Sequence, residues 1–247
     1  MPNYKSFAEL KALARMQMRG NNTALIGAFL LQELIAFLAS FLLIIFIPGT
    51  DTASSILSFV VSLVLQLLIG IIQIGAHLLF LHAACNMNCQ ITDLFYAFRN
   101  NTDKAIKVQI PLVLISAICS LPSNIYSWHI GYTEDFNLLM NSYLIMLGGL
   151  FVNALIQLFL FPLLYLFLDF PDMEVDELYR KSVAIMKGNK LRLFLLELSF
   201  IPAMLLGFVT CGLALFWMIP YMNVTVTNFY LDIMSQRNKQ QNEGYMC

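Results

Sequence analysis

Charged residues are scarce in this 247-residue chain. Asp, Glu, Lys and Arg together make up 12% of the sequence, whereas apolar residues make up 59% and the mean hydropathy is +0.73. Soluble domains contain about 25% charged and 45–50% apolar residues. This composition excludes an ordinary soluble domain and indicates an integral membrane protein.

Motifs of the common enzyme families are also missing. The sequence has no P-loop, no His-Glu-x-x-His pair, no Gly-x-Ser-x-Gly elbow and no polar segment long enough to form a soluble domain. No RNA- or DNA-binding motif accompanies its basic residues. We therefore expect a protein that is not an enzyme, uses no cofactor and binds no nucleic acid.

The 14 Lys and Arg residues lie only in short segments between long apolar runs, at residues 5–19, 99–107, 180–192 and 237–239. Short loops rich in Lys and Arg stay on the cytoplasmic side of a membrane. One helical span needs about 20 apolar residues. The sequence therefore predicts a multi-pass protein with both termini in the cytoplasm and six spans, at residues 23–47, 54–84, 105–121, 141–168, 191–209 and 212–231.

Three similar junctions recur along the chain. Each ends a short amphipathic segment and precedes a pair of spans; the first segment begins with a capping box, Ser6-x-x-Glu9. Gly or Asn tolerates the positive φ found after a helix, and a basic residue suits the negative helix end. The junctions are Arg19-Gly20-Asn21-Asn22, Arg99-Asn100-Asn101-Thr102 and Lys187-Gly188-Asn189-Lys190.

These patterns predict an all-α fold with six transmembrane helices in three hairpins, each preceded by a short cytoplasmic amphipathic helix. The whole chain, residues 1–247, forms one membrane domain. One interpretation is a threefold internal repeat over residues 5–84, 91–169 and 172–232. The other is an irregular six-helix bundle whose amphipathic segments lie at the interface.

The carboxyl-terminal third of the chain contains the most specific motifs: Leu168-Asp169-Phe170-Pro171, Met186-Lys187-Gly188-Asn189-Lys190 and Trp217-Met218-Ile219-Pro220-Tyr221. Together with Leu10-Lys11-Ala12-Leu13-Ala14-Arg15, they resemble the bacterial membrane family called domain of unknown function 975 (DUF975). The chain is also distantly similar to the membrane part of some glycerophosphodiester phosphodiesterases, but not to their catalytic domain. The resemblance implies a bacterial cell-membrane protein and transfers no catalytic residue.

Ionisable residues inside the predicted spans are the candidates for function, because lipid penalises charge. Glu33 lies about ten residues into the first span, roughly 15 Å deep, where a charge costs about 2.5–3.5 kcal/mol. His77 and Glu197 lie in the inner half of the bilayer, as do Asn223 and Thr227. We expect these residues to line a pocket open to the cytoplasm. There Glu33 and Glu197 are acceptors, and His77 shuttles protons or pairs with them. In the alternative, Glu33 only hydrogen-bonds within the bundle and Glu197 extends toward the interface.

Two other groups of residues admit weaker functional interpretations. His82, Cys85 and Cys89 have a helical spacing that suits a soft metal, but no fourth ligand is evident, and we expect no metal and free thiols. The predicted outer connection, residues 122–140, contains Tyr126, Trp128, His129 and Tyr132, which favour an interfacial aromatic belt over a ligand-binding lid.

Two classes of function remain open. The first is the transport or handling of a small solute or lipid through the inner-leaflet pocket. The second is an interaction or immunity-type protein that binds a peptide, toxin or membrane protein without transport. Membrane lipids are expected partners in both cases, together with a membrane-protein partner or further copies of the chain.

Overall fold

The computed structural model describes residues 4–47, 51–131 and 135–244, except the side chains of Thr52, Phe208 and residues 239–244. Within this part of the chain the fold is all-helical, as predicted, and contains no strand. In chain order, its elements are α1 (Phe7–Gln17), α2 (Asn22–Phe46), α3 (Thr52–Ala84), η1 (Ile91–Phe95), α4 (Tyr96–Arg99), α5 (Thr102–Ile130), α6 (Phe136–Leu160), α7 (Leu163–Asp169), α8 (Val175–Met186), α9 (Lys190–Leu198), α10 (Ile201–Val209) and α11 (Leu215–Gly244).

Four helical stretches are long and apolar enough to cross a membrane: Asn22–Phe46, Ala53–Ala84, Thr102–Ile130 and Phe136–Asp169. They correspond to the first four predicted spans. The fifth predicted span is divided into α9 and α10, and the sixth is the first part of α11, which contains Asn223, Thr225, Thr227 and Asn228. The arrangement of six spans in three hairpins therefore stays a prediction.

Helix α5 is longer than the span predicted for it. It runs through Pro111 and Pro122 to Ile130, so an outer loop beginning at Pro122 was wrong. Tyr126, Trp128 and His129 lie on this helix, and the Trp128 ring packs edge-on against Phe59 of α3, 5.9 Å between centroids. Tyr132 lies outside the described residues.

Local geometry at the helix ends follows the sequence closely. The backbone N–H of Ser6 donates to Oε2 of Glu9 at 2.7 Å, and the backbone N–H of Glu9 donates to Oγ of Ser6 at 3.3 Å, which confirms the capping box. Each of the three junctions contains one residue with positive φ: 99° at Gly20, 55° at Asn101 and 89° at Gly188. The chain therefore turns between short and long helices where Gly or Asn was expected to permit it.

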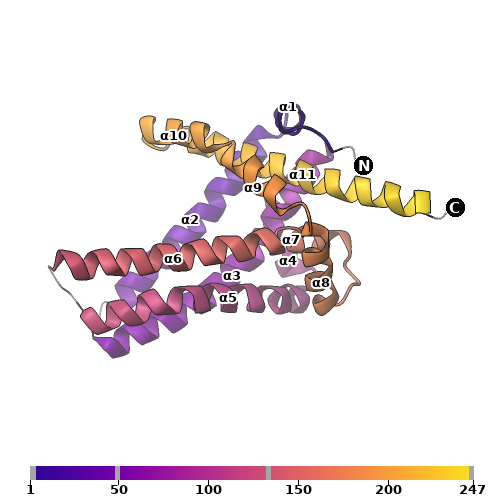
Figure 1. The fold of residues 1–247 in the computed structure, drawn as a ribbon. Coiled ribbons are helices and arrows are strands. Elements are labelled where there is room, and N and C mark those ends of the chain that lie inside the picture. The colour runs from indigo at the N-terminus through magenta and orange to yellow at the C-terminus, as the bar shows by residue number, and fades with distance from the viewer. Residues whose placement is uncertain (1–3, 48–50, 132–134, 245–247) are drawn as a thin grey trace.

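Helix α3 lies at the centre of the fold and packs against α2, α5, α7, α11 and η1. Figure 1 shows α5 and α6 side by side, and α1 lying against α11. Helices α4, α7 and α8 gather at one end, opposite the end at which α5 stops and α6 begins. We call this end the basic end; its cations include Arg99, Lys104, Lys107, Arg180, Lys181, Lys187 and Lys190.

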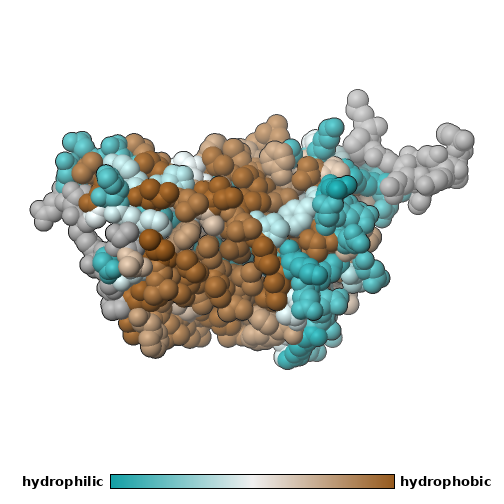
Figure 2. Space-filling view, turned by 90° about the horizontal axis from the view of Figure 1, so that it is seen from below, coloured by the Kyte–Doolittle hydropathy of each residue, from teal (hydrophilic) through white to brown (hydrophobic). Residues whose placement is uncertain are grey.

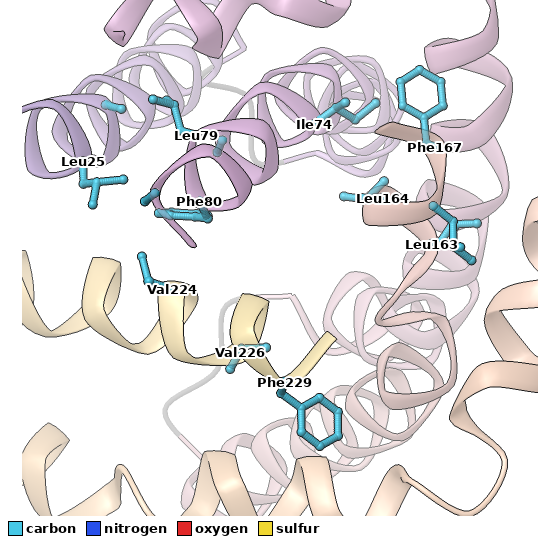
Figure 3. Packing of buried hydrophobic residues seen from close by; sticks show 14 of the residues in the cluster. Leu25, Ile74, Leu79, Phe80, Leu163, Leu164, Phe167, Val224, Val226 and Phe229 are labelled. Atoms are coloured by element: carbon cyan, nitrogen blue, oxygen red, sulfur yellow. The ribbon is translucent and has the colours of Figure 1, made fainter. Parts of the chain in front are cut away.

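The core lies toward the basic end, where short and long helices meet. Figure 3 shows Leu25 of α2, Phe80 of α3 and Val224 of α11 gathered together, while Leu164 and Phe167 of α7 face α3. Away from this core the long helices expose apolar side chains: none of the most apolar stretch of α2 is buried. Figure 2 shows a broad hydrophobic surface with hydrophilic residues gathered mainly at one side. Lipid is the environment that this surface fits.

Candidate functional site

A polar cleft of about 590 Å³ lies between α3, α5, α6, α7 and α9. It contains two of the five predicted site residues, His77 from α3 and Glu197 from α9. Sequences 120 residues apart are therefore brought to one site, because α9 packs against α6 and closes this side of the bundle. The remaining lining residues are Gln66, Ile69, Gly70, Gln73, Gln109, Leu112, Val113, Ser116, Ala154, Gln157, Leu158, Leu160, Phe161, Leu164 and Leu193.

Amide side chains supply most of the cleft's hydrogen-bonding groups. Gln109 is buried and donates to the carbonyl of Gly70 at 2.6 Å, which ties α5 to α3. Ser116 donates to Oε1 of Gln66 at 3.2 Å. Gln66, Gln73 and Gln157 remain exposed, so the cleft is open on one side. Within an otherwise apolar bundle, this cleft thus exposes side-chain hydrogen-bond donors and acceptors.

His77 has a defined orientation. Its Nδ1 lies 2.8 Å from the carbonyl oxygen of Gln73, one turn earlier on α3. Only a protonated Nδ1 can donate to a carbonyl, so in the neutral ring Nε2 is an acceptor. The imidazole also packs edge-on against the ring of Tyr165, 4.9 Å between centroids. The backbone contact at Nδ1 and the aromatic neighbour therefore hold this ring in place, and Nε2 remains as an acceptor.

Glu197 supplies a carboxyl group to the cleft. Within the described part of the chain its carboxylate makes no hydrogen bond or ion pair, and no Lys or Arg is among the residues that line the cleft. A half-buried carboxylate without a cationic partner either takes up a proton or attracts a group that supplies one or more donors. The cleft therefore favours a cation or a hydrogen-bond donor over an anion.

Thr227 and Asn223 lie behind the cleft instead of lining it. The Tyr165 hydroxyl is 2.9 Å from the Thr227 hydroxyl, which in turn donates to the backbone carbonyl of Asn223 at 2.8 Å. Tyr165 also stacks on Tyr230 at 4.8 Å. The prediction that Asn223 and Thr227 face the pocket was wrong, since neither is among the residues that line the cleft. Tyr165 links Thr227 to His77.

Sequence reasoning missed the residues of this aromatic network. The Tyr230 hydroxyl donates to the carboxylate of Asp169, so the network joins α7 to α11. A signal was available: three helices contain related motifs, Leu79-Phe80-Leu81-His82 in α3, Leu166-Phe167-Leu168-Asp169 in α7 and Phe229-Tyr230-Leu231-Asp232 in α11. Each places a polar residue directly after an aromatic–Leu pair. That recurrence was the clue to the polar groups at the basic end.

Glu33 does not join this site. Its side chain is exposed on α2, among exposed apolar neighbours such as Leu34 and Phe37. Its predicted depth is unaffected, but its direction was wrong, since hydropathy gives the depth of a residue and not the face of the helix it occupies. Three ionisable residues were predicted to line one pocket. Of these, the cleft contains His77 and Glu197 but not Glu33.

A smaller cavity of about 230 Å³ continues the polar surface away from the basic end. It shares Gln66 and Ser116 with the cleft and adds Ser120 and Ser123 of α5 and Asn153 of α6. The Oδ1 atom of Asn153 is buried and accepts no hydrogen bond. Polar groups therefore line the α3–α5–α6 interface over much of its length.

The three weak metal candidates do not form a ligand set. No group of three or more His, Cys, Asp or Glu that could hold a metal occurs among the described residues. Nδ1 of His82 instead contacts Oδ2 of Asp93 at 3.2 Å. Burial, with a contribution from the Asp93 carboxylate, raises the pKa of the Cys89 thiol to about 11. A thiol that stays protonated at neutral pH is a poor metal ligand.

The fold and the cleft define the class: a helical protein with four candidate membrane-spanning helices and a polar cleft among them. Residues 1–237 match the family described as Protein of unknown function (DUF975), and the chain belongs to this family. The family resemblance is thereby confirmed, while the similarity to glycerophosphodiester phosphodiesterases stays a prediction. No curated protein and no solved structure matches the chain. Function must therefore be argued from the site.

Proposed function

We propose that this protein is a non-enzymatic, multi-pass protein of the bacterial cytoplasmic membrane that binds and handles a small solute in the cleft. In this proposal, α9–α10 and the first part of α11 form a third hairpin, giving six spans. The basic end and both termini face the cytoplasm, as the distribution of Lys and Arg favours. The short helices then lie near the inner membrane surface.

One observation carries the proposal: His77, Glu197 and four glutamines meet in one cleft inside an apolar bundle. Polar groups in a membrane are costly, and those retained there mark sites for substrates, ions or protons. Because the lining offers one carboxylate, amide oxygens and no cation, we assign it a solute with an ammonium group or hydroxyls. The second cavity, which shares Gln66 and Ser116, provides a continuation toward the opposite end.

Glu197→Gln should abolish this binding. Purified protein is heated with ethanolamine, glycerol or acetate as probes, and the midpoint of thermal unfolding is recorded. A ligand at 100 times its Kd stabilises the folded state by about 2.7 kcal/mol, so ethanolamine should raise the midpoint by several degrees, glycerol less, and acetate not at all. Glu33→Gln, which lies outside the cleft, is the control and should respond like the unchanged protein. Equal responses from both variants would exclude the cleft as the site.

A second candidate function, protein interaction, is favoured by Glu33. Its carboxylate lies on an exposed apolar face of α2, about ten residues from the start of a candidate span. A carboxyl group facing lipid is costly, and a neighbouring helix that presents a hydrogen-bond donor would relieve that cost. This face would then bind a transmembrane helix of a partner.

A photo-crosslinking amino acid at Phe37, on the same face of α2, tests this candidate in cells. We expect one discrete crosslinked protein band that disappears in Glu33→Leu. The same amino acid at Val152, which is 49% exposed on α6, serves as the control for random collisions. Lipid adducts alone at both positions would reject an interaction through Glu33.

A further inference from the structure

A second groove lies at the basic end, outside the polar cleft. A groove of about 600 Å³ follows α8 and the start of α9, lined by Tyr179, Arg180, Val183, Ala184, Lys187 and Lys190. Three of these six residues are cationic, and none is acidic. Neither His77 nor Glu197 contributes to it. The groove therefore has a chemistry opposite to that of the cleft.

The positive charge of the groove is only slightly compensated. Arg180 pairs with Asp176 one turn earlier at 2.6 Å, but both side chains are more than 70% exposed, so water weakens the attraction. Lys187 and Lys190 make no ion pair with any residue that the structure describes. The Lys190 ammonium lies over the Phe159 ring of α6, 3.2 Å from its centroid, which holds this cation at the groove.

The surface next to these cations is apolar. Val183 is 43% exposed within the groove. Leu191, directly after Lys190, and Phe194 and Leu195, about one helical turn further along α9, are also exposed. A ligand that satisfies both surfaces has an anionic head and hydrocarbon chains. A free anion would leave the apolar surface unused, and a soluble acidic peptide would not cover it inside a bilayer.

We infer that this groove binds the headgroup of an anionic phospholipid, with its acyl chains along the exposed face of α9. The phosphate lies among Arg180, Lys187 and Lys190, and the chains pack on Leu191 and Phe194. The inference goes beyond the solute-binding function, since it involves a different cavity and the opposite charge. It also places one ordered lipid against α9, the helix that supplies Glu197 to the cleft.

The test measures which lipids remain bound to the purified chain. The protein is reconstituted in phosphatidylcholine vesicles with or without phosphatidylglycerol, extracted, and examined by native mass spectrometry. Unchanged protein should retain phosphatidylglycerol in preference to phosphatidylcholine. Arg180→Gln/Lys187→Gln/Lys190→Gln should weaken that preference at least about 10-fold, because each cation near an anionic surface contributes to binding.

A charge-matched variant separates a specific site from general attraction. Lys5→Gln/Arg15→Gln/Arg19→Gln removes three exposed cations that belong neither to the groove nor to α8 and α9, and should keep the preference. An equal loss in this variant would overturn the inference, as would displacement of the lipid by inorganic phosphate alone, which would indicate a soluble anion. If the triple groove variant does not fold, Lys187→Glu, at an exposed position, must reduce phosphatidylglycerol retention, or the inference fails.

Discussion

Gly149→Ala should lower the free energy of unfolding by about 1–3 kcal/mol or more, whereas Gly148→Ala, one residue earlier on α6, should not lower it. A Cβ atom at Gly149 would lie well under 3.0 Å from the backbone carbonyl oxygen of Cys119 on α5. That neighbour is backbone, so the two helices would have to separate. A Cβ at Gly148 meets nothing within 4 Å.

The two neighbouring substitutions add the same methyl group, so their difference isolates the contact. Both gain about 1 kcal/mol of helix propensity from replacing Gly by Ala, which makes Gly148→Ala neutral or slightly stabilising. Unfolding by sodium dodecyl sulfate in mixed micelles, followed by circular dichroism, measures both. Equal stability of the two variants would show that α5 and α6 do not approach at Cys119. Because Ser116 and Gln157 lie on these helices, a separation would also widen the solute cleft.

The positions of the four long apolar helices along the chain were predictable, because hydropathy depends on sequence alone. The four candidate spans and the turns at Gly20, Asn101 and Gly188 follow from such sequence signals. The end of α5 did not, since Pro122 was taken as the start of an outer connection, whereas the helix runs through it to Ile130. Proline removes one hydrogen bond and does not end a helix that its neighbours hold in place.

Rotation about each helix axis was not predictable, and it decides which residues share a site. Glu33 and His77 both lie on candidate spans, yet α2 turns Glu33 outward while α3 turns His77 into the cleft. These directions depend on packing between helices distant in sequence. The packing of α9 against α6, which brings Glu197 to the cleft, is likewise a tertiary contact. When lipid and protein neighbours are equally apolar, the pattern of apolar residues along a helix does not show which face packs against protein.

Removing the cation of the buried Arg192–Asp232 pair should destabilise the protein strongly. Arg192 of α9 contacts Oδ2 of Asp232 of α11 at 2.8 Å, and the two side chains are 17% and 1% exposed. The same carboxylate accepts the backbone N–H of Lys5, while Arg192 donates to the Lys5 carbonyl at 2.7 Å. This pair therefore joins the segment before α1 to α9 and α11. Arg192→Met leaves a buried carboxylate without its cation, which costs about 3–5 kcal/mol.

The double variant Arg192→Met/Asp232→Leu should recover most of that loss, because both charges are replaced by apolar groups of similar size. Arg180→Met is the matched control: its pair with Asp176 is exposed, and such pairs contribute about 0–1 kcal/mol. Detergent unfolding of the four proteins measures the free energy of unfolding in each case. If Arg192→Met were as mild as Arg180→Met, the buried pair would not hold α9 to α11. The position of Glu197, seven residues after Lys190 on the same short helix, would then depend on its contacts with α6 instead.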